Sequence, residues 1–190
     1  EVYVTGRWPH EGVDFTGKRV AVIGTGSSGI QSIPLIAEQA SEVVIFQRTP
    51  NYSIPAFNGP APQYRVERLK TDRAAYEAEA RLSPTGVPIT MPTVSALSVS
   101  HETAFEMLEV AWQKGELLEP GLVFTDVGTN RAANDVVAEF MRIKIRSVVK
   151  DPQVAELLSP RKNPYGTKRP CMDTRYFETY NLPHVRLIDL

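Results

Sequence analysis

A glycine-rich segment near the start of the chain has the residue types and the spacing that bind a dinucleotide. It runs Gly-Thr-Gly-Ser-Ser-Gly from Gly24 to Gly29 and so follows the pattern G-x-G-x-x-G. The apolar run Val20 to Ile23 before it predicts a buried strand of a parallel sheet, and apolar residues at helical spacing after it predict a helix over Ser28 to Ala40. This context favours a dinucleotide site over a glycine-rich turn of some other α/β fold.

Each glycine of this segment has a physical task in a strand–turn–helix unit. Gly24 permits the tight turn, Gly26 lets the backbone approach the pyrophosphate, and Gly29 lets the helix pack closely on the strand. The N-terminus of the helix offers free N–H groups and the positive end of its dipole to a phosphate.

The end of the next strand indicates which dinucleotide is bound. Val43 to Phe46 predicts a second parallel strand, and NAD-binding folds usually place Asp or Glu at its end, about 20 residues past the glycines. This chain has Gln47, Arg48 and Thr49 there instead. Arg48 offers a planar, permanently charged guanidinium that suits a phosphate, and Thr49 adds a hydroxyl donor. The segment predicts a 2′-phosphate site and hence NADP(H); the alternative is a surface arginine that contacts nothing.

Composition bounds the class of protein. The 190 residues carry a net charge of −1, which indicates no nucleic acid or membrane partner, and no run approaches the roughly 18 apolar residues of a membrane helix. Cys171 is the one cysteine, which excludes an internal disulfide and fits a reducing cytoplasm; we expect an inert, half-buried thiol. The chain starts at Glu1 without a methionine and stops at Leu190 in a strand-like run, so we expect a piece of a larger protein.

The middle of the chain predicts a helical insertion, over about residues 60–160, in a Rossmann-like three-layer α/β domain. Proline-rich stretches separate its helices, and Trp112, Phe140 and Ile145 have the spacing of core residues. After the insertion the sheet resumes at Val185 to Leu190. The expected helices cover Gln63–Leu82, Ser100–Lys114 with Ser100 as the N-cap, Ala132–Lys150, and a short segment that starts at Asp151-Pro152.

Two further segments could act on a ligand. Trp8 and Pro9 are not typical of a simple linker, because an indole buries a large apolar surface and proline stiffens the chain. Lys168 and Arg169 are adjacent cations between Gly166 and Pro170, in the loop through which the chain returns to the sheet. From composition alone these cations fit a solvated surface as well as they fit a binding site.

Five segments together have the pattern of a known family. They are Thr-Gly-Arg-Trp-Pro-His-Glu-Gly-Val-Asp-Phe from Thr5, Gly-Thr-Gly-Ser-Ser-Gly-Ile-Gln from Gly24, Phe-Gln-Arg-Thr-Pro from Phe46, Lys-Arg-Pro from Lys168, and Tyr-Phe-Glu-Thr-Tyr-Asn from Tyr176. On these segments the chain resembles the NADPH-binding part of the Baeyer–Villiger monooxygenases, the flavoenzymes that turn ketones into esters or lactones. It is most similar to the cyclopentanone, steroid and phenylacetone type. Trp8 and Pro9 match the end of the family signature F-x-G-x-x-x-H-x-x-x-W-P, whereas Val4 occupies the position of its histidine.

The resemblance implies a role for individual residues. Arg48, Thr49 and Lys168 correspond to the residues that hold the 2′-phosphate of NADPH, and Arg169 corresponds to the catalytic arginine that stabilises the negatively charged flavin peroxide and the nicotinamide. The glycine motif corresponds to the NADP fingerprint, so FAD is expected in a domain outside this stretch. The intact protein would then oxidise a small-molecule ketone with O₂, and the fragment alone would be inactive. The residues expected to bind the cofactor are Gly24, Thr25, Gly26, Ser27, Ser28, Gly29, Gln31, Arg48, Thr49 and Lys168.

Two other functions need residues that the chain lacks, and two more remain as alternatives. A short-chain ketone reductase needs Tyr-x-x-x-Lys, and no tyrosine here has a lysine four residues later; a flavin disulfide reductase needs paired cysteines. An N-hydroxylating flavin monooxygenase and a non-catalytic NADP-binding module are the remaining alternatives. Trp8-Pro9 and Lys168-Arg169-Pro170 favour the Baeyer–Villiger type over the N-hydroxylating type. A second G-x-G-x-x-G upstream would exclude the non-catalytic module.

Overall fold

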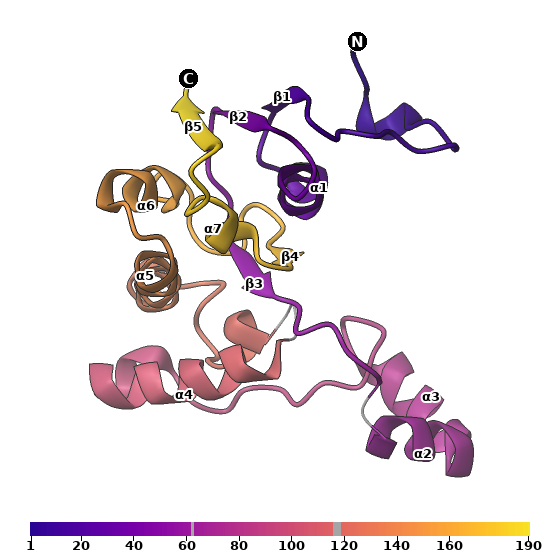
Figure 1. Ribbon diagram of the computed structural model, residues 1–190. Helices are drawn as coiled ribbons and strands as arrows, with labels where there is room; N and C mark the ends of the chain where they lie inside the picture. The colour runs from indigo at the N-terminus through magenta and orange to yellow at the C-terminus, as the bar shows by residue number, and fades with distance from the viewer. Residues whose placement is uncertain (62, 116–118) are drawn as a thin grey trace.

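A parallel sheet of three strands, with a helix between its first two, forms the frame of the fold (Figure 1). The structure, a computed structural model, describes residues 1–61, 63–115 and 119–190. In the sheet, β2 (Glu42–Gln47) lies between β1 (Arg19–Ile23) and β5 (Val185–Asp189), and α1 (Ser27–Ala37) connects β1 to β2. The strand–helix–strand unit predicted around the glycine motif is therefore confirmed.

One face of this sheet is buried against α1. Val43, Ile45 and Val185 share that face because side chains alternate along each strand, and they form a core with Ile30 and Ile33 of the helix. Ile30 and Ile33 have no exposed surface. The helical spacing of the apolar residues after the glycine motif thus identifies the buried side of α1 correctly.

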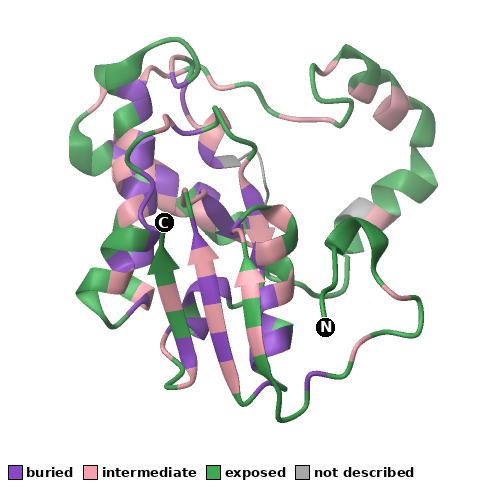
Figure 2. Cartoon of the chain, turned by 90° about the horizontal axis from the view of Figure 1, so that it is seen from above, coloured by how far each residue is buried: buried purple, intermediate pink, exposed green. Residues whose placement is uncertain are grey.

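The opposite face of the sheet is exposed (Figure 2). Ala21 and Ile188 lie on it together with Ile23, which is 84% exposed. In Figure 2 the helices that pack on the sheet lie behind the three strands, and other helices lie to one side, so the described residues supply a helical layer on one face only. The prediction of a buried first strand is wrong for the described residues: β1 has exposed and half-buried residues and pairs there with β2 alone, which its apolar sequence does not reveal.

A second, two-stranded sheet pairs segments that show no strand pattern in the sequence. β3 (Ser53–Pro55) pairs in parallel with β4 (Cys171–Asp173), and α7 (Tyr176–Thr179) follows β4. Each strand has three residues, and β3 contains a proline, so neither shows the alternation that predicts a strand. The Ser53 hydroxyl donates a hydrogen bond to the Asp173 carboxylate, whose pKa is raised by burial. This sheet joins the segment after β2 to the segment that follows the helical region.

Between residues 60 and 160 the described residues form helices without strands (Figure 1). Ser100 and Asp151 cap two of them as predicted, because their side chains accept hydrogen bonds from backbone N–H groups of the first turn. The expected helix over Gln63–Leu82 is two helices, since the Asp72 side chain accepts a hydrogen bond from the Ala75 N–H group and starts a new one. The helices are α2 (Gln63–Thr71), α3 (Arg73–Leu82), α4 (His101–Lys114), α5 (Arg131–Val148) and α6 (Pro152–Leu158), with short 3-10 helices η1 (Thr5–Arg7), η2 (Ala96–Ser98) and η3 (Glu119–Leu122).

Aromatic side chains expected in the interior differ in burial. Phe140 of α5 is buried, as is Ile145, but Trp112 of α4 is only half-buried. Trp112 packs edge-on against Phe140, with 6.1 Å between the ring centroids, and the ammonium of Lys144 lies over the Trp112 ring. Trp8 is 38% exposed, so the large burial expected of its indole does not occur among the described residues. No helix in the described part of the chain is long and apolar enough to span a membrane.

Candidate dinucleotide-binding site

The glycine loop forms the turn between β1 and α1. Gly24 has a φ of +98°, a conformation that glycine adopts without strain, and its N–H group donates to the carbonyl oxygen of Phe46 in β2 at 2.9 Å. A Cβ atom on Gly29 would overlap the carbonyl oxygen of Gly24, so the helix can pack this closely on the turn only with glycine at that position.

The start of α1 is accessible to an anion. Gly26 is the N-cap residue and offers no side-chain acceptor to the first N–H groups of the helix. In the described part of the chain, nothing outside the immediate chain neighbours lies within 4 Å of a Cβ position on Gly24 or Gly26. Available N–H donors, the positive end of the helix dipole and an open approach together fit a pyrophosphate.

Two residues expected to contact the dinucleotide form side-chain hydrogen bonds within the protein, Thr25 in a buried position and Gln31 in an exposed one. Thr25 is buried, and its hydroxyl lies 3.3 Å from both the side-chain oxygen of Gln47 and the carbonyl oxygen of Thr49. The Gln31 side chain donates to the carbonyl oxygen of Met172 in β4 at 3.4 Å. The Thr25 side chain therefore connects the glycine loop to the end of β2.

Arg48 and Thr49 follow β2 directly and line a cavity of about 240 Å³. The Arg48 side chain is exposed and has no carboxylate partner among the residues that the structure describes. Arg161, Lys162 and the acidic Asp189 line the same cavity from the segment after α6 and from the end of β5. A guanidinium without an internal partner is available to bind an anion at this end of the sheet.

Lys168 and Arg169 lie on the segment that leads into β4, close to the segment that carries Arg48. The side-chain amide of Asn51 donates to the carbonyl oxygen of Arg169 at 3.1 Å, although the two residues are 118 positions apart in the sequence. The side chains of Lys168 and Arg169 are exposed, and neither has a carboxylate partner within the described ranges. The fold thus brings two cationic segments together beyond the end of β2.

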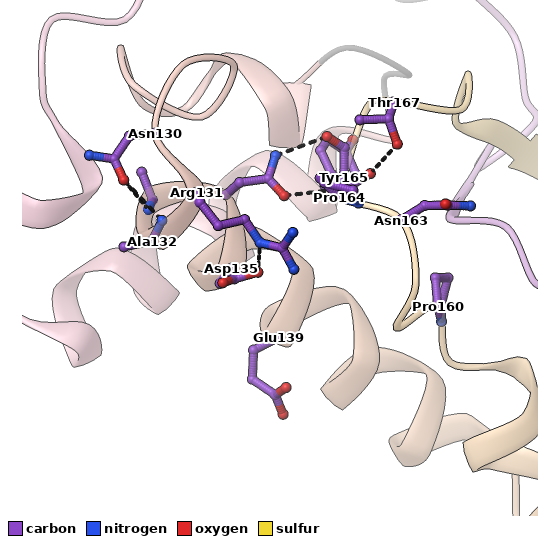
Figure 3. Close-up of polar contacts among 12 residues, drawn as sticks. Asn130, Arg131, Ala132, Asp135, Glu139, Pro160, Asn163, Pro164, Tyr165 and Thr167 are labelled. Atoms are coloured by element: carbon purple, nitrogen blue, oxygen red, sulfur yellow. Dashed lines mark hydrogen bonds and ion pairs between the residues drawn. The ribbon is translucent and has the colours of Figure 1, made fainter.

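The loop that leads to Lys168 is anchored on the start of α5 (Figure 3). Asn134 of α5 is buried; its side chain accepts from the Tyr165 N–H group at 2.8 Å and donates to the Tyr165 carbonyl oxygen at 2.9 Å. The Thr167 hydroxyl donates to the Pro164 carbonyl oxygen at 2.9 Å. A cavity of about 440 Å³ beside this loop shares no lining residue with the glycine loop. The helical region therefore determines where Lys168 lies.

The cysteine lies where these segments meet, and it is more buried than expected. Cys171 is 3% exposed, and its sulfur lies 3.1 Å from the hydroxyl oxygen of Ser27 in α1 and 3.2 Å from the side-chain nitrogen of Asn51. Sequence reasoning missed Asn51 altogether. The one available signal is a polar residue directly after Arg-Thr-Pro, which does not predict a contact with a residue 120 positions away.

Comparison with known proteins gives a consistent set of relatives, although no family model matches the chain. The cyclopentanone 1,2-monooxygenase of Comamonas sp. is 39% identical over 191 residues, which cover 99% of this chain and 34% of the relative. The Baeyer–Villiger monooxygenase of Pseudooceanicola batsensis is 37% identical over 187 residues, 98% of this chain and 34% of the relative. A phenazine N-monooxygenase of Lysobacter antibioticus is 35% identical over 191 residues, 100% of this chain and 35% of the relative.

Solved structures agree with these alignments. A steroid monooxygenase bound to NADP superposes with a TM-score of 0.90 at 50% identity, over 97% of this chain and 35% of that protein. The chain is homologous to part of a Baeyer–Villiger monooxygenase. OTEMO in complex with FAD and NADP superposes with a TM-score of 0.88 at 37% identity, over 96% of this chain and 35% of that protein. The chain thus spans about a third of the length of the Baeyer–Villiger monooxygenase and the other relatives, and the Rossmann-like fold class is confirmed for that third.

Proposed function

We propose that this chain is the NADPH-binding part of an FAD-dependent Baeyer–Villiger monooxygenase, which converts ketones to esters or lactones with O₂. One observation carries the proposal: the segments with Arg48 and with Lys168-Arg169 lie together near an open glycine loop, in a chain 50% identical to a steroid monooxygenase bound to NADP. A dinucleotide without a 2′-phosphate would require the glycine loop but not the cations. The two cationic segments therefore support NADPH over NADH.

The binding roles follow from the position of each group. The N–H groups at the start of α1 bind the pyrophosphate, and the backbone from Gly24 to Gly29, with the hydroxyls of Ser27 and Ser28, surrounds it. Arg48 and Lys168 bind the 2′-phosphate oxygens through charge-assisted hydrogen bonds, and the Thr49 hydroxyl adds a donor.

Arg169 is the residue that we assign to the reaction itself. FAD, held by the rest of the protein, supplies the redox chemistry with O₂ when it is bound. The Arg169 guanidinium stabilises negative charge that develops in a site from which water is excluded. Asn51 holds the Arg169 backbone while the side chain is exposed, so the guanidinium is able to reach a group bound outside this chain.

We assign residues 1–190 to an incomplete NADP-binding domain with a helical insertion over about residues 60–160, and the FAD domain to other parts of the same protein. The exposed apolar face of the sheet and the one-third coverage of the relatives support this division. We place the protein in the cytoplasm, where the Cys171 thiol stays reduced, and take its partners to be a small-molecule ketone and O₂.

The test uses the full-length protein that contains this chain. We expect flavin absorbance, NADPH oxidation that depends on a ketone, and an ester or lactone that carries one oxygen from isotopically labelled O₂. A full-length protein without flavin would contradict the proposal. Nitrogen oxidation is the second candidate because of the phenazine N-monooxygenase relative, and it would be established by oxidation of an N-heteroaromatic compound without oxidation of any ketone.

A further inference from the structure

Three segments of the candidate site meet at one side-chain amide and one thiol. The Asn51 side-chain nitrogen lies 3.1 Å from the carbonyl oxygen of Arg169 and 3.2 Å from the sulfur of Cys171, and that sulfur lies 3.1 Å from the Ser27 hydroxyl oxygen. The Cys171 N–H group in turn donates to the carbonyl oxygen of Tyr52 at 3.0 Å. The start of α1, the segment after β2 and the segment before β4 are thereby connected through polar groups.

The orientation of the Asn51 amide is determined at both of its ends. Its nitrogen donates to Arg169 and Cys171, and its oxygen accepts from the Tyr52 N–H group at 3.0 Å. A rotation that exchanged nitrogen and oxygen would place an acceptor against the Arg169 carbonyl and a donor against an N–H group. The amide therefore holds the Arg169 backbone in one position relative to β2.

Apart from the anchoring of Tyr165 on α5 and the pairing of β3 with β4, which restrain the backbone, no ion pair or side-chain hydrogen bond among the described residues holds the cations themselves. The side chains of Lys168 and Arg169 are exposed and make no ion pair within the described ranges, and the same holds for Arg48. Their relative position depends on the backbone segments that carry them. Asn51 is three residues after Arg48 and contacts the residue next to Lys168, so it spans the gap between the two segments.

We propose that Asn51 is a positioning residue for 2′-phosphate recognition: it holds the segment with Lys168 and Arg169 against the segment with Arg48 and Thr49, so that cations from both segments bind one phosphate. The proposal rests on the NADPH-binding function assigned above. Asn51 does not touch the phosphate; it acts through the Arg169 carbonyl and the Cys171 sulfur.

The chain offers a matched control at the other end of the small sheet. The side-chain nitrogen of Asn58 donates to the Thr174 hydroxyl at 2.9 Å, so Asn58 also connects the segment of β3 to the segment of β4. β3 and β4 pair from Ser53 with Cys171 to Pro55 with Asp173, which places the Asn51 and Asn58 contacts at opposite ends of the ladder. Only the Asn51 end adjoins Lys168 and Arg169.

The experiment compares four variants of the full-length, FAD-loaded protein: Asn51→Ala, Asn51→Asp, Asn58→Ala and Arg48→Ala. Stopped-flow flavin reduction gives the reduction rate constant divided by Kd for NADPH and for NADH, and the ratio of these two values is the readout. A purely structural defect lowers both values together, because NADH lacks only the 2′-phosphate, whereas misplaced cations lower the NADPH value. We expect the ratio to fall about 5-fold in Asn51→Ala, the effect of one neutral hydrogen bond. It should fall further in Asn51→Asp, which cannot donate and also adds a negative charge beside the phosphate site.

The outcomes separate this proposal from the one on which it rests. A wild-type ratio in both Asn51 variants, with a reduced ratio in Arg48→Ala, would overturn the role of Asn51 and leave the NADPH assignment intact. An equal fall in Asn58→Ala would also overturn it, since pairing of β3 with β4 would then be sufficient. An unchanged ratio in Arg48→Ala would instead contradict the role of Arg48 in the phosphate site, on which this proposal rests. Where Asn51→Ala does not fold, Asn51→Leu, which is uncharged and similar in size but cannot donate, takes its place.

Discussion

Removal of the Arg48 guanidinium is the sharpest test of the cofactor assignment. Arg48 directly follows β2, where NAD-binding folds usually have a carboxylate, and its side chain has no ion-pair partner in the described part of the chain. The Arg48→Ala variant therefore removes no hydrogen bond or ion pair that the structure describes. Any loss of NADPH affinity in this variant then comes from a lost contact with the nucleotide and not from a change in the fold.

The expected size of the effect follows from the exposure of the side chain. Hydrogen bonds to charged groups contribute about 1.5–3 kcal/mol each in protected sites. Exposed ion pairs contribute less, about 0.2–1 kcal/mol, because water and salt screen them. We expect a value between these limits, about 1.4 kcal/mol, which corresponds to a 10-fold loss of preference for NADPH over NADH. Combined with Lys168→Ala, the loss should reach roughly 10²-fold.

The assay is a titration of the full-length variants with NADPH and with NADH at fixed ionic strength. Arg161→Ala is the matched control, because Arg161 lines the same cavity but its guanidinium is paired with Glu156. We expect Arg48→Ala and Lys168→Ala to lose affinity for NADPH but not for NADH, and Arg161→Ala to keep the wild-type preference. An unchanged preference in both Arg48→Ala and Lys168→Ala would refute the assignment of a 2′-phosphate site to this end of the sheet.

Three further predictions concern the reaction, the glycine loop and pH. Arg169→Ala in the full-length protein should abolish ester formation but retain flavin, which product analysis and the flavin spectrum would check; normal ester yield would show that the role of Arg169 is wrong. Gly29→Ala should destabilise the domain by about 1–3 kcal/mol, because the added Cβ overlaps the Gly24 carbonyl oxygen, and should lower the thermal midpoint and NADPH affinity together. A hydrogen bond from Arg161, and a second one from Arg146, lower the pKa of Glu156 in the folded state. The Glu156 carboxylate therefore stabilises the fold above the unfolded pKa of about 4.3, and this stabilisation is lost as the pH falls through the lower folded pKa. Thermal midpoints of Glu156→Gln and wild type should therefore differ at pH values near neutrality and converge in acid; a difference that persists in acid would contradict this account.

The sequence by itself determined the elements that depend on neighbours along the chain. The strand, turn and helix around Gly24 follow from an apolar run, glycine conformations and helical spacing, all within one short segment. The caps at Ser100 and Asp151 are likewise formed by side chains that bond backbone groups two or three residues away. Such contacts need no knowledge of the rest of the fold. The break at Asp72 belongs to the same class: the aspartate is a recognisable cap, but continuous helical propensity on both sides obscured it.

Only the tertiary structure decided which distant segments share the site. The pairing of β3 with β4, and the bond from Asn51 to Arg169 across 118 positions, depend on how the helical region returns the chain to the sheet. Segments of three residues carry too little alternation to predict such a pairing. Burial of β1 was misjudged for a related reason, because the apolar sequence of a strand does not specify how many of its sides and faces are covered. The chemistry of each cation could be predicted from its residue type, but their convergence arises from contacts between residues far apart in the sequence.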